Sequence, residues 1–290
     1  MAHVEQNQEK KVIVAEDLSS LGSISMGIAL PILATFGFTV VPVPTMLLSA
    51  QTEGFGKPEI LDLHCWWKNS VQSWNKLGNL KLNAGLLGYL GSVEMIKVMQ
   101  EFLDRDLVGM VVLDPAMADS GKLYAGFDAN YVDAMRGLLG KANIVTPNIT
   151  EAQLLADIKV GHYPTNDELI QLFDALQTVM KPNSQLIITG VHDTETISTV
   201  WLVNGHVKRF EQPKVTGHFD GTGDLFAAVL TGCLASNSLL EKSIEVASKV
   251  VRSTILKTSR KDQSSHYGLN VGCAINELQK QIEGLGENLE

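Results

Sequence analysis

Residues 11–43, KVIVAEDLSSLGSISMGIALPILATFGFTVVPV, contain the unit from which the fold can be worked out. Residues 11–16 form an apolar run typical of a buried strand, and residues 25–36 have the spacing of a helix. Gly37 is placed to end that helix, and residues 39–43 form a second β-type run. This stretch therefore predicts a β-α-β unit.

The same rhythm continues along the chain. Helices are predicted over residues 93–103, 129–139, 150–156 and 165–179, and strands over residues 108–113, 142–145 and 185–189. The alternation predicts an α/β fold with a mostly parallel central sheet and helices on both faces.

A hairpin interrupts the rhythm late in the chain. Two β-type runs, 196–203 and 206–210, flank Asn204-Gly205, the dipeptide that a type I′ turn prefers. We therefore expect an antiparallel hairpin in the sheet, followed by helices over 222–234 and 239–256. Because no repeat, low-complexity tract or Gly/Ser linker marks a boundary, residues 1–290 are predicted to form a single domain.

Composition excludes several classes of protein. The net charge is −9, and no basic cluster is present beyond Lys10-Lys11, so a nucleic-acid partner is not expected. Cys65, Cys233 and Cys273 are far apart and form no C-x-x-C pair, which favours a reducing compartment. The N-terminus is polar where a signal peptide is apolar. We therefore expect a cytoplasmic protein.

One uncharged segment, residues 18–52, has the length of a membrane span. Pro31, Pro42, Pro44 and Gly37 divide it into a short helix and a strand, so the uninterrupted apolar run that a span requires is missing. No membrane association is expected.

The motif Gly221-Thr222-Gly223-Asp224 stands directly before the apolar run 225–230 and is predicted to pass from a loop into a helix. Glycines let the backbone turn its N–H groups toward one point, and the helix dipole adds positive charge there, so this motif can hold a phosphate. Asp224 could then act as a general base for an alcohol. The alternative is that Asp224 only stabilises the helix N-terminus.

A second candidate is Asn148 with Glu151, which follows a predicted strand and opens a helix. Amide and carboxylate oxygens suit Mg²⁺, although a simple helix cap is an equal alternative. Asp114 also stands at a strand end, as do Asp17 and Thr189. Because ligands of α/β sheets bind at that edge, these side chains are expected to converge.

Other active-site patterns are missing from the sequence. It contains no Walker A loop, no H-x-x-x-H spacing and no Gly-x-Ser-x-Gly elbow. ATP, if used, must be bound through the glycine-capped helix. Trp66 and Trp67 are expected to belong to a packed core or a subunit interface.

Together, Gly221-Thr222-Gly223-Asp224 and Asn148-x-x-Glu151 resemble the ribokinase superfamily. Within it, residues 114–124 (DPAMADSGKLY), 146–155 (TPNITEAQLL) and 48–55 (LSAQTEGF) resemble the corresponding stretches of pyridoxal kinases. The resemblance runs from about residue 12 to residue 256.

The resemblance implies the role of each site residue. Asp224 would be the catalytic base, with Gly221, Thr222 and Gly223 as the anion hole. ATP would be bound by Asn148, Glu151, Thr189 and Gly190, metal by Asp114 and Glu151, and substrate by Asp17, Thr52 and Tyr89. Asp17 departs from the family, because many pyridoxal kinases have a serine at this position.

The implied activity is ATP-dependent phosphorylation of the 5′-hydroxymethyl group of a B6 vitamer. The implied cofactors are ATP and Mg²⁺, with a monovalent cation such as K⁺ left open, and the implied assembly is a homodimer. Hydroxymethylpyrimidine kinases share the fold and motifs and are the first alternative. A non-catalytic protein that binds the vitamer or nucleotide is the second.

Overall fold

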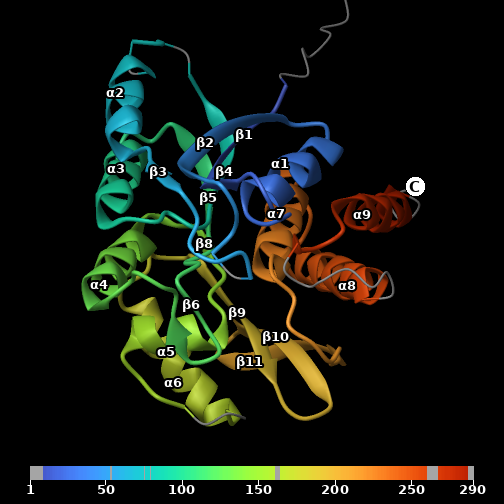
Figure 1. Cartoon of the computed structure of the whole chain (residues 1–290). Coiled ribbons are helices and arrows are strands. Elements are labelled where there is room, and N and C mark those ends of the chain that lie inside the picture. The colour runs from blue at the N-terminus through green and yellow to red at the C-terminus, as the bar shows by residue number, and fades with distance from the viewer. Residues whose placement is uncertain are drawn as a thin grey trace, which may run out of the picture.

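The computed structural model describes residues 9–52, 54–74, 76–78, 80–160, 164–259 and 267–286. A nine-stranded sheet runs through this part of the chain in the order β11-β10-β9-β8-β5-β4-β1-β2-β3 (Figure 1). Its strands are β1 (Lys11–Ser19), β2 (Thr39–Leu48), β3 (Ile60–Asp62), β4 (Leu82–Leu87), β5 (Val108–Leu113), β8 (Ile144–Val145), β9 (Gln185–His192), β10 (Thr196–Val203) and β11 (His206–Pro213). The short strands β6 (Ala118–Asp119) and β7 (Lys122–Leu123) pair separately.

The sheet is mostly parallel, as predicted. β1 pairs in parallel with β2 and β4, and the parallel pairing continues through β5 and β8 to β9. β10 and β11 form the expected antiparallel hairpin. Asn204 and Gly205 at its turn have φ of 52° and 77°, the positive values that a type I′ turn requires.

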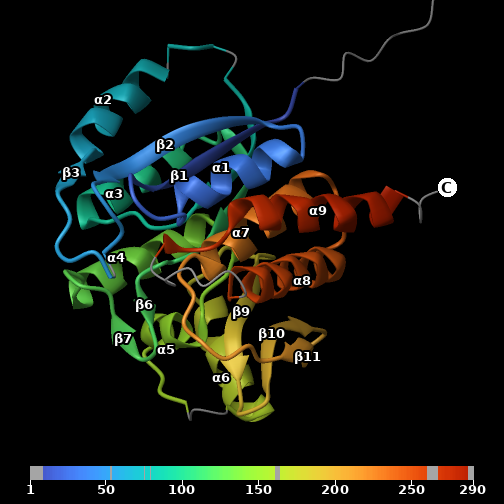
Figure 2. The ribbon, with the colours of Figure 1, turned by 45° about the vertical axis from the view of Figure 1, so that its right-hand side comes forward.

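Helices cover both faces of the sheet. One layer contains α2 (His64–Trp74), α3 (Val93–Leu103), α4 (Ala129–Leu138), α5 (Ile149–Ala156) and α6 (Asn166–Gln177), with a 3₁₀ turn at Leu139–Lys141. The other contains α1 (Met26–Thr35), α7 (Thr222–Ala235), α8 (Leu240–Ser259) and α9 (Val271–Gly286), which lie together in Figure 2.

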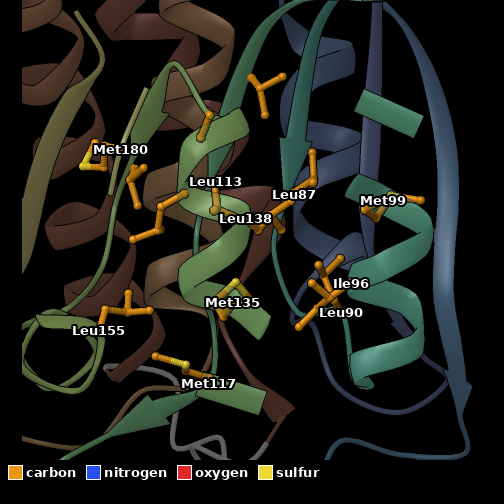
Figure 3. Close-up of a cluster of buried hydrophobic side chains, with 14 of the residues drawn as sticks. Leu87, Leu90, Ile96, Met99, Leu113, Met117, Met135, Leu138, Leu155 and Met180 are labelled. Carbon is orange, nitrogen blue, oxygen red and sulfur yellow. The ribbon is translucent and has the colours of Figure 1, made fainter. Parts of the chain in front are cut away.

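Each layer has its own buried core. In β1, Ile13 and Ala15 point to the α2–α6 layer, part of which Figure 3 shows, while Val12 and Val14 point to the α1, α7, α8 and α9 layer. Burial on both faces explains why this strand is an almost continuous apolar run.

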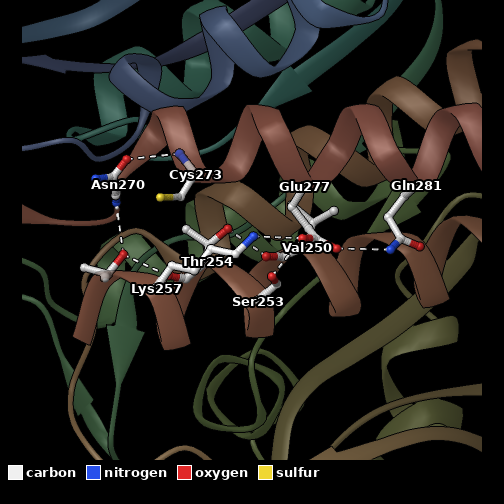
Figure 4. A network of polar contacts seen from close by, with 9 residues as sticks. Val250, Ser253, Thr254, Lys257, Asn270, Cys273, Glu277 and Gln281 are labelled. Carbon is white, nitrogen blue, oxygen red and sulfur yellow. Dashed lines mark hydrogen bonds and ion pairs between the residues drawn. The ribbon is translucent and has the colours of Figure 1, made fainter. Parts of the chain in front are cut away.

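Several elements lie outside the predicted set. α2, β4 and α9 were not predicted, and β8 is two residues shorter than the predicted strand 142–145. α9 extends the core beyond residue 256, because Ala274 and Leu278 are buried. Polar contacts also fix α9 to α8, since the Lys257 ammonium lies 2.9 Å from the Glu277 carboxylate (Figure 4).

The uncharged segment and the tryptophan pair can now be placed. Residues 18–52 form the end of β1, α1 and β2, so they belong to the folded core, and no helix among the described residues is long and apolar enough to cross a membrane. Trp67 is buried against Trp74, whereas Trp66 is exposed.

Candidate active site

Every site residue predicted from the sequence lines one cavity of about 560 Å³. It lies at the edge of the sheet where the parallel strands end, as α/β folds favour. The predicted residues that line it are Asp17, Thr52, Tyr89, Asp114, Asn148, Glu151, Thr189, Gly190, Gly221, Thr222, Gly223 and Asp224.

The N-terminus of α7 forms an open cradle in this cavity. Gly221 caps the helix with φ of +86° and no side-chain hydrogen bond. A Cβ atom there would lie 2.6 Å from the Ile28 Cδ1 atom, so glycine is required by both conformation and space. Because the helix cannot supply acceptors for its first N–H groups, they can bind an anion.

Asp224 stands in the first turn of α7. Its Oδ2 atom accepts a hydrogen bond of 2.7 Å from the backbone N–H of Ser25, whose φ of 43° is unusual for a residue with a side chain. Burial raises the pKa of Asp224 to about 6, and the charges of Asp17 and Asp220 act in the same direction. Asp224 is therefore ionised at neutral pH and more basic than an ordinary aspartate, which suits a general base.

Asp114 directly follows β5 and faces this cradle. A Cβ atom on Gly223 would lie 3.4 Å from the Asp114 Oδ2 atom, so the carboxylate lies against the first turn of α7. Burial, together with the charges of Glu151 and Asp224, raises the pKa of Asp114 well above its ordinary value. A cation placed here would relieve that repulsion.

Asn148 and Glu151 form the N-terminal cap of α5. The Asn148 side chain accepts the Glu151 N–H at 3.0 Å, and the Glu151 carboxylate accepts the Asn148 N–H at 2.9 Å. Glu151 also accepts the Met117 N–H at 2.9 Å. Burial raises the pKa of Glu151 to about 7. The helix cap, one of the two alternatives for Asn148 and Glu151, is therefore present. If Glu151 also binds a metal ion, it does so in addition to capping α5.

The fit of the site to a metal ion follows from its donors. Among the described residues, no three His, Cys, Asp or Glu side chains come together as a group able to hold a metal. Asp114 and Glu151 are hard oxygen donors on the cavity wall. They suit Mg²⁺, which commonly uses one or two carboxylates together with water and the phosphates of a substrate.

A second part of the cavity combines an acid with aromatic rings. Asp17 is buried beside a register shift in β1, and the Ser19 hydroxyl donates to its Oδ2 atom at 3.1 Å. Burial raises the pKa of Asp17. The Tyr89 ring lies 5.3 Å from that of Phe127 and 6.5 Å from that of Tyr124. Exposed Thr52 lies at the mouth of the cavity. This arrangement suits a flat ring with polar substituents.

The third part extends toward the hairpin and α8. Thr189 and Gly190 lie on β9, where the Thr189 N–H donates to the Pro147 carbonyl at 2.9 Å. Beyond them the cavity is lined by Ile197, Phe210, Gln212, Val251 and Ile255, with Lys214 and Arg252 as cationic side chains. An apolar slot beside basic groups suits a nucleotide base and its phosphates.

The sequence analysis missed one buried acid next to the site. Glu16 is 1% exposed, and both of its carboxylate oxygens are buried without a hydrogen-bond partner among the described residues. A Cβ atom on Gly88 would lie 2.6 Å from the Glu16 Oε1 atom, so the glycine leaves room for the carboxylate. Burial, and then the charge of Asp224, raises its pKa well above the ordinary value. The only sequence signal was an acid at the end of an apolar run.

The chain is a kinase of the ribokinase superfamily: it has the mostly parallel sheet with a late hairpin and, at the sheet edge, an acid in the first turn of a glycine-capped helix. The chain belongs to the phosphomethylpyrimidine kinase family, whose family model matches residues 71–269. This match confirms the predicted superfamily, and the solved structures confirm the predicted likeness to pyridoxal kinases.

Solved structures agree with this assignment. Pyridoxal kinase from Lactobacillus plantarum is 33% identical with a TM-score of 0.89, over 95% of this chain and 98% of its own. A candidate phosphomethylpyrimidine kinase from Bacteroides thetaiotaomicron, solved with pyridoxal, is 30% identical with a TM-score of 0.87, over 94% and 96%. Pyridoxal kinase from Leishmania donovani, solved with ADP and pyridoxamine, shares the fold at 24% identity and a TM-score of 0.80, over 93% and 96%.

Proposed function

We propose that this chain is a pyridoxal kinase (EC 2.7.1.35), which transfers the γ-phosphate of ATP to the 5′-hydroxymethyl group of a B6 vitamer. The observation that carries the proposal is the position of Asp224 in one cavity with both a phosphate cradle and an aromatic, acidic pocket. Support also comes from relatives that bind pyridoxal, or ADP with pyridoxamine.

Each part of the cavity has a task in this proposal. The vitamer ring lies beside Tyr89 with a polar substituent toward Asp17, and Thr52 closes the mouth. The nucleotide base occupies the slot between the hairpin and α8, and its phosphates reach the N–H groups of α7. The two substrates then meet at Asp224.

Asp224 removes the proton of the vitamer hydroxyl as the hydroxyl oxygen attacks the γ-phosphorus, and the bond from that phosphorus to the β–γ bridging oxygen breaks to release ADP. The N–H groups of α7 stabilise the charge on the transferred phosphoryl group, and catalysis rests on positioning and electrostatics. Bound Mg²⁺, held from Asp114 and Glu151, would supply further neutralisation of the phosphates. Whether the enzyme also uses a monovalent cation such as K⁺ is left open in this proposal.

Hydroxymethylpyrimidine kinase is the second candidate function, favoured by the family model that matches the chain. Its substrate is also a flat heteroaromatic ring with a hydroxymethyl group. A non-catalytic binder is disfavoured, because a protein that only binds has no need for a basic carboxylate in the cradle.

A coupled assay of ATP consumption with pyridoxal, pyridoxine, pyridoxamine, hydroxymethylpyrimidine and ribose separates these functions. We expect the highest kcat/KM with a B6 vitamer. A higher value with hydroxymethylpyrimidine would favour the second function, and no turnover with any of them would favour a binder.

The role of Asp17 has its own test. Asp17→Ser should change the ratio of kcat/KM values among the vitamers more than it changes the KM for ATP, because Asp17 lies on the aromatic side of the cavity. A change confined to the KM for ATP would contradict the pocket assignment.

We further propose that the enzyme is a cytoplasmic homodimer. Light scattering would test the assembly, and cell fractionation would test the compartment.

A further inference from the structure

Three polar side chains from two distant loops, Gln51 from one and His218 and Asp220 from the other, meet beside the phosphate cradle. Asp220, which directly precedes Gly221, is the central one. Its Oδ2 atom accepts a hydrogen bond of 2.9 Å from the Gln51 side-chain amide, and its Oδ1 atom lies 3.0 Å from His218 Nε2. All three residues line the cavity. We call them the Gln51–Asp220–His218 bridge.

The position of Asp220 creates a problem for anion binding. A carboxylate one residue before a helix cap can bind the helix N–H groups itself, and its charge repels a phosphate. The Asp220 carboxylate is held away from the helix N–H groups, because one of its oxygens contacts Gln51 and the other contacts His218. Among the described residues, no hydrogen bond joins the Asp220 carboxylate to the first N–H groups of α7.

Gln51 is well placed to hold Asp220 away from the helix. Its side chain is 2% exposed, and its backbone N–H donates to the Leu21 carbonyl at 3.1 Å. A Cβ atom on Gly22 would lie only 3.4 Å from the Gln51 Cδ atom, so the amide is packed against the glycine. Gln51 therefore fixes one carboxylate oxygen from a rigid position.

His218 contributes charge as well as geometry. Its side chain is largely exposed, whereas that of Asp220 is mostly buried. When His218 is protonated, its imidazolium lies 3.0 Å from the Asp220 carboxylate and cancels its charge. In that state the pair presents no net charge to an incoming phosphate.

We propose that the Gln51–Asp220–His218 bridge sets the affinity of the cradle for nucleotide phosphates, with His218 as the positioning residue that neutralises Asp220. This inference rests on the proposed nucleotide binding and assigns a role to three residues outside the motif. It makes the affinity depend on the sum of two charges, so the effects of removing each charge must oppose one another.

The test is a double-mutant cycle with ADP titrated calorimetrically at low salt, where charge effects are least screened. His218→Gln leaves Asp220 uncompensated and should weaken ADP binding roughly 10-fold, within the range known for charges at helix N-termini. Asp220→Asn keeps an acceptor for Gln51 and should tighten binding several-fold. The double variant should return to within about 2-fold of the parent protein, because its charge sum is the same.

His64→Gln is the matched control. His64 Nδ1 lies 2.8 Å from Asp62 Oδ1, so this pair has the same chemistry, but neither residue lines the cavity. ADP affinity should be unchanged in this variant. Melting temperatures of all variants show that the proteins compared are folded.

Two results would overturn the inference. A double variant as weak as His218→Gln would mean that His218 contacts the phosphate itself and does not act through Asp220. A cycle in which no variant differs from the parent protein would mean that the bridge only ties loops together. A parent protein that fails to bind ADP would contradict the proposed function itself, which is a distinguishable outcome.

Discussion

Helices α5 and α7 both begin at the edge of the sheet with an acid at the third helical position, but the two acids have different partners. In α5, Glu151 reaches back to the N–H of its own cap residue, Asn148, whose side chain reciprocates. In α7, Asp224 accepts instead from Ser25, a residue of a different segment, and the cap residue is a glycine without a side chain.

This difference decides which helix end can bind a ligand. In α5 the capping box occupies the N–H groups of Asn148 and Glu151, so its acid stabilises the fold before it serves any ligand. The glycine cap of α7 leaves its first N–H groups without a side-chain acceptor among the described residues, so the acid and the amides are both available for chemistry. An acid in the first turn is therefore available as a base beside an anion site only when the cap residue leaves the amides open, whereas a self-capped acid such as Glu151 stabilises its helix as well as facing the cavity.

The largest expected effect is on Asp224. Asp224→Asn should lower kcat by roughly 10²–10⁴-fold, because Asn fits the same place but cannot take a proton. The melting temperature should change little. Since the pKa of Asp224 is about 6 and the base must be ionised, kcat/KM of the parent enzyme should fall as the pH drops below about 6.

The measurement is kcat, ATP affinity and melting temperature on one preparation, with a pH profile from 5 to 9. Near-normal kcat with a lowered melting temperature would mean that Asp224 only stabilises the N-terminus of α7, as Glu151 stabilises that of α5. The two helices would then not differ in function.

Glu151 should show a loss of stability that Asp224 does not. Glu151→Ala removes the acceptor of the Asn148 and Met117 N–H groups and should lower the free energy of unfolding by about 1–3 kcal/mol. Glu168→Ala, in the exposed capping box of α6, is the matched control and should cost less. Urea denaturation provides both values. A loss below about 1 kcal/mol in Glu151→Ala would contradict a contribution from the buried contact to Met117.

Glu16 extends the comparison to a buried acid with no partner among the described residues. Its folded-state pKa is raised above the ordinary value near 4.5, so folding favours the protonated form. That stability is present at low pH and is lost as the pH rises above the unfolded-state pKa, by up to about 1.4 kcal/mol per pH unit.

Glu16→Gln removes this titration while keeping the shape of the side chain. The variant should therefore gain stability relative to the parent protein as the pH rises from 5 to 8, as measured by urea denaturation at each pH. A stability difference that stays constant with pH would show that Glu16 is ionised in the folded protein and has found a partner.

The elements predicted best from the sequence were those with strong local signals. Strands 108–113 and 196–203 match β5 and β10 to the residue, because turn signals bound their apolar runs. β4 was missed because LNAGLL has weak strand propensity. Its Gly85 is selected by tertiary packing, since a Cβ there would lie 2.9 Å from Ile13 Cγ2 and 3.2 Å from Val108 Cγ1.

The same distinction applies to the site. Asp114, Asn148 and Asp224 could be found because strand ends and helix starts in a parallel sheet share one edge. The contact of Asp220 with Gln51 could not be found, because it joins loops 169 residues apart with no periodic signal. The burial of Glu16 was equally hidden, since it depends on Gly88 of another segment.

The smallest effect concerns Asn148, and it tests whether a helix cap can also serve the active site. Asn148 and Thr165 cap α5 and α6 in the same way, each accepting the N–H of a glutamate three residues later. Asn148→Ala and Thr165→Ala should each lower the free energy of unfolding by about 1 kcal/mol.

Of these two cap residues, only Asn148 lines the cavity, between Glu151 and the β9 residues proposed to bind ATP. If it helps to organise Mg²⁺ and the phosphates, Asn148→Ala alone should raise the Mg²⁺ concentration needed for half-maximal rate, while Thr165→Ala keeps the parent value. Titrating Mg²⁺ at fixed ATP for both variants decides the question. Identical Mg²⁺ curves would reduce Asn148 to a cap and would leave the open N-terminus of α7 as the part of this edge that acts on the phosphates.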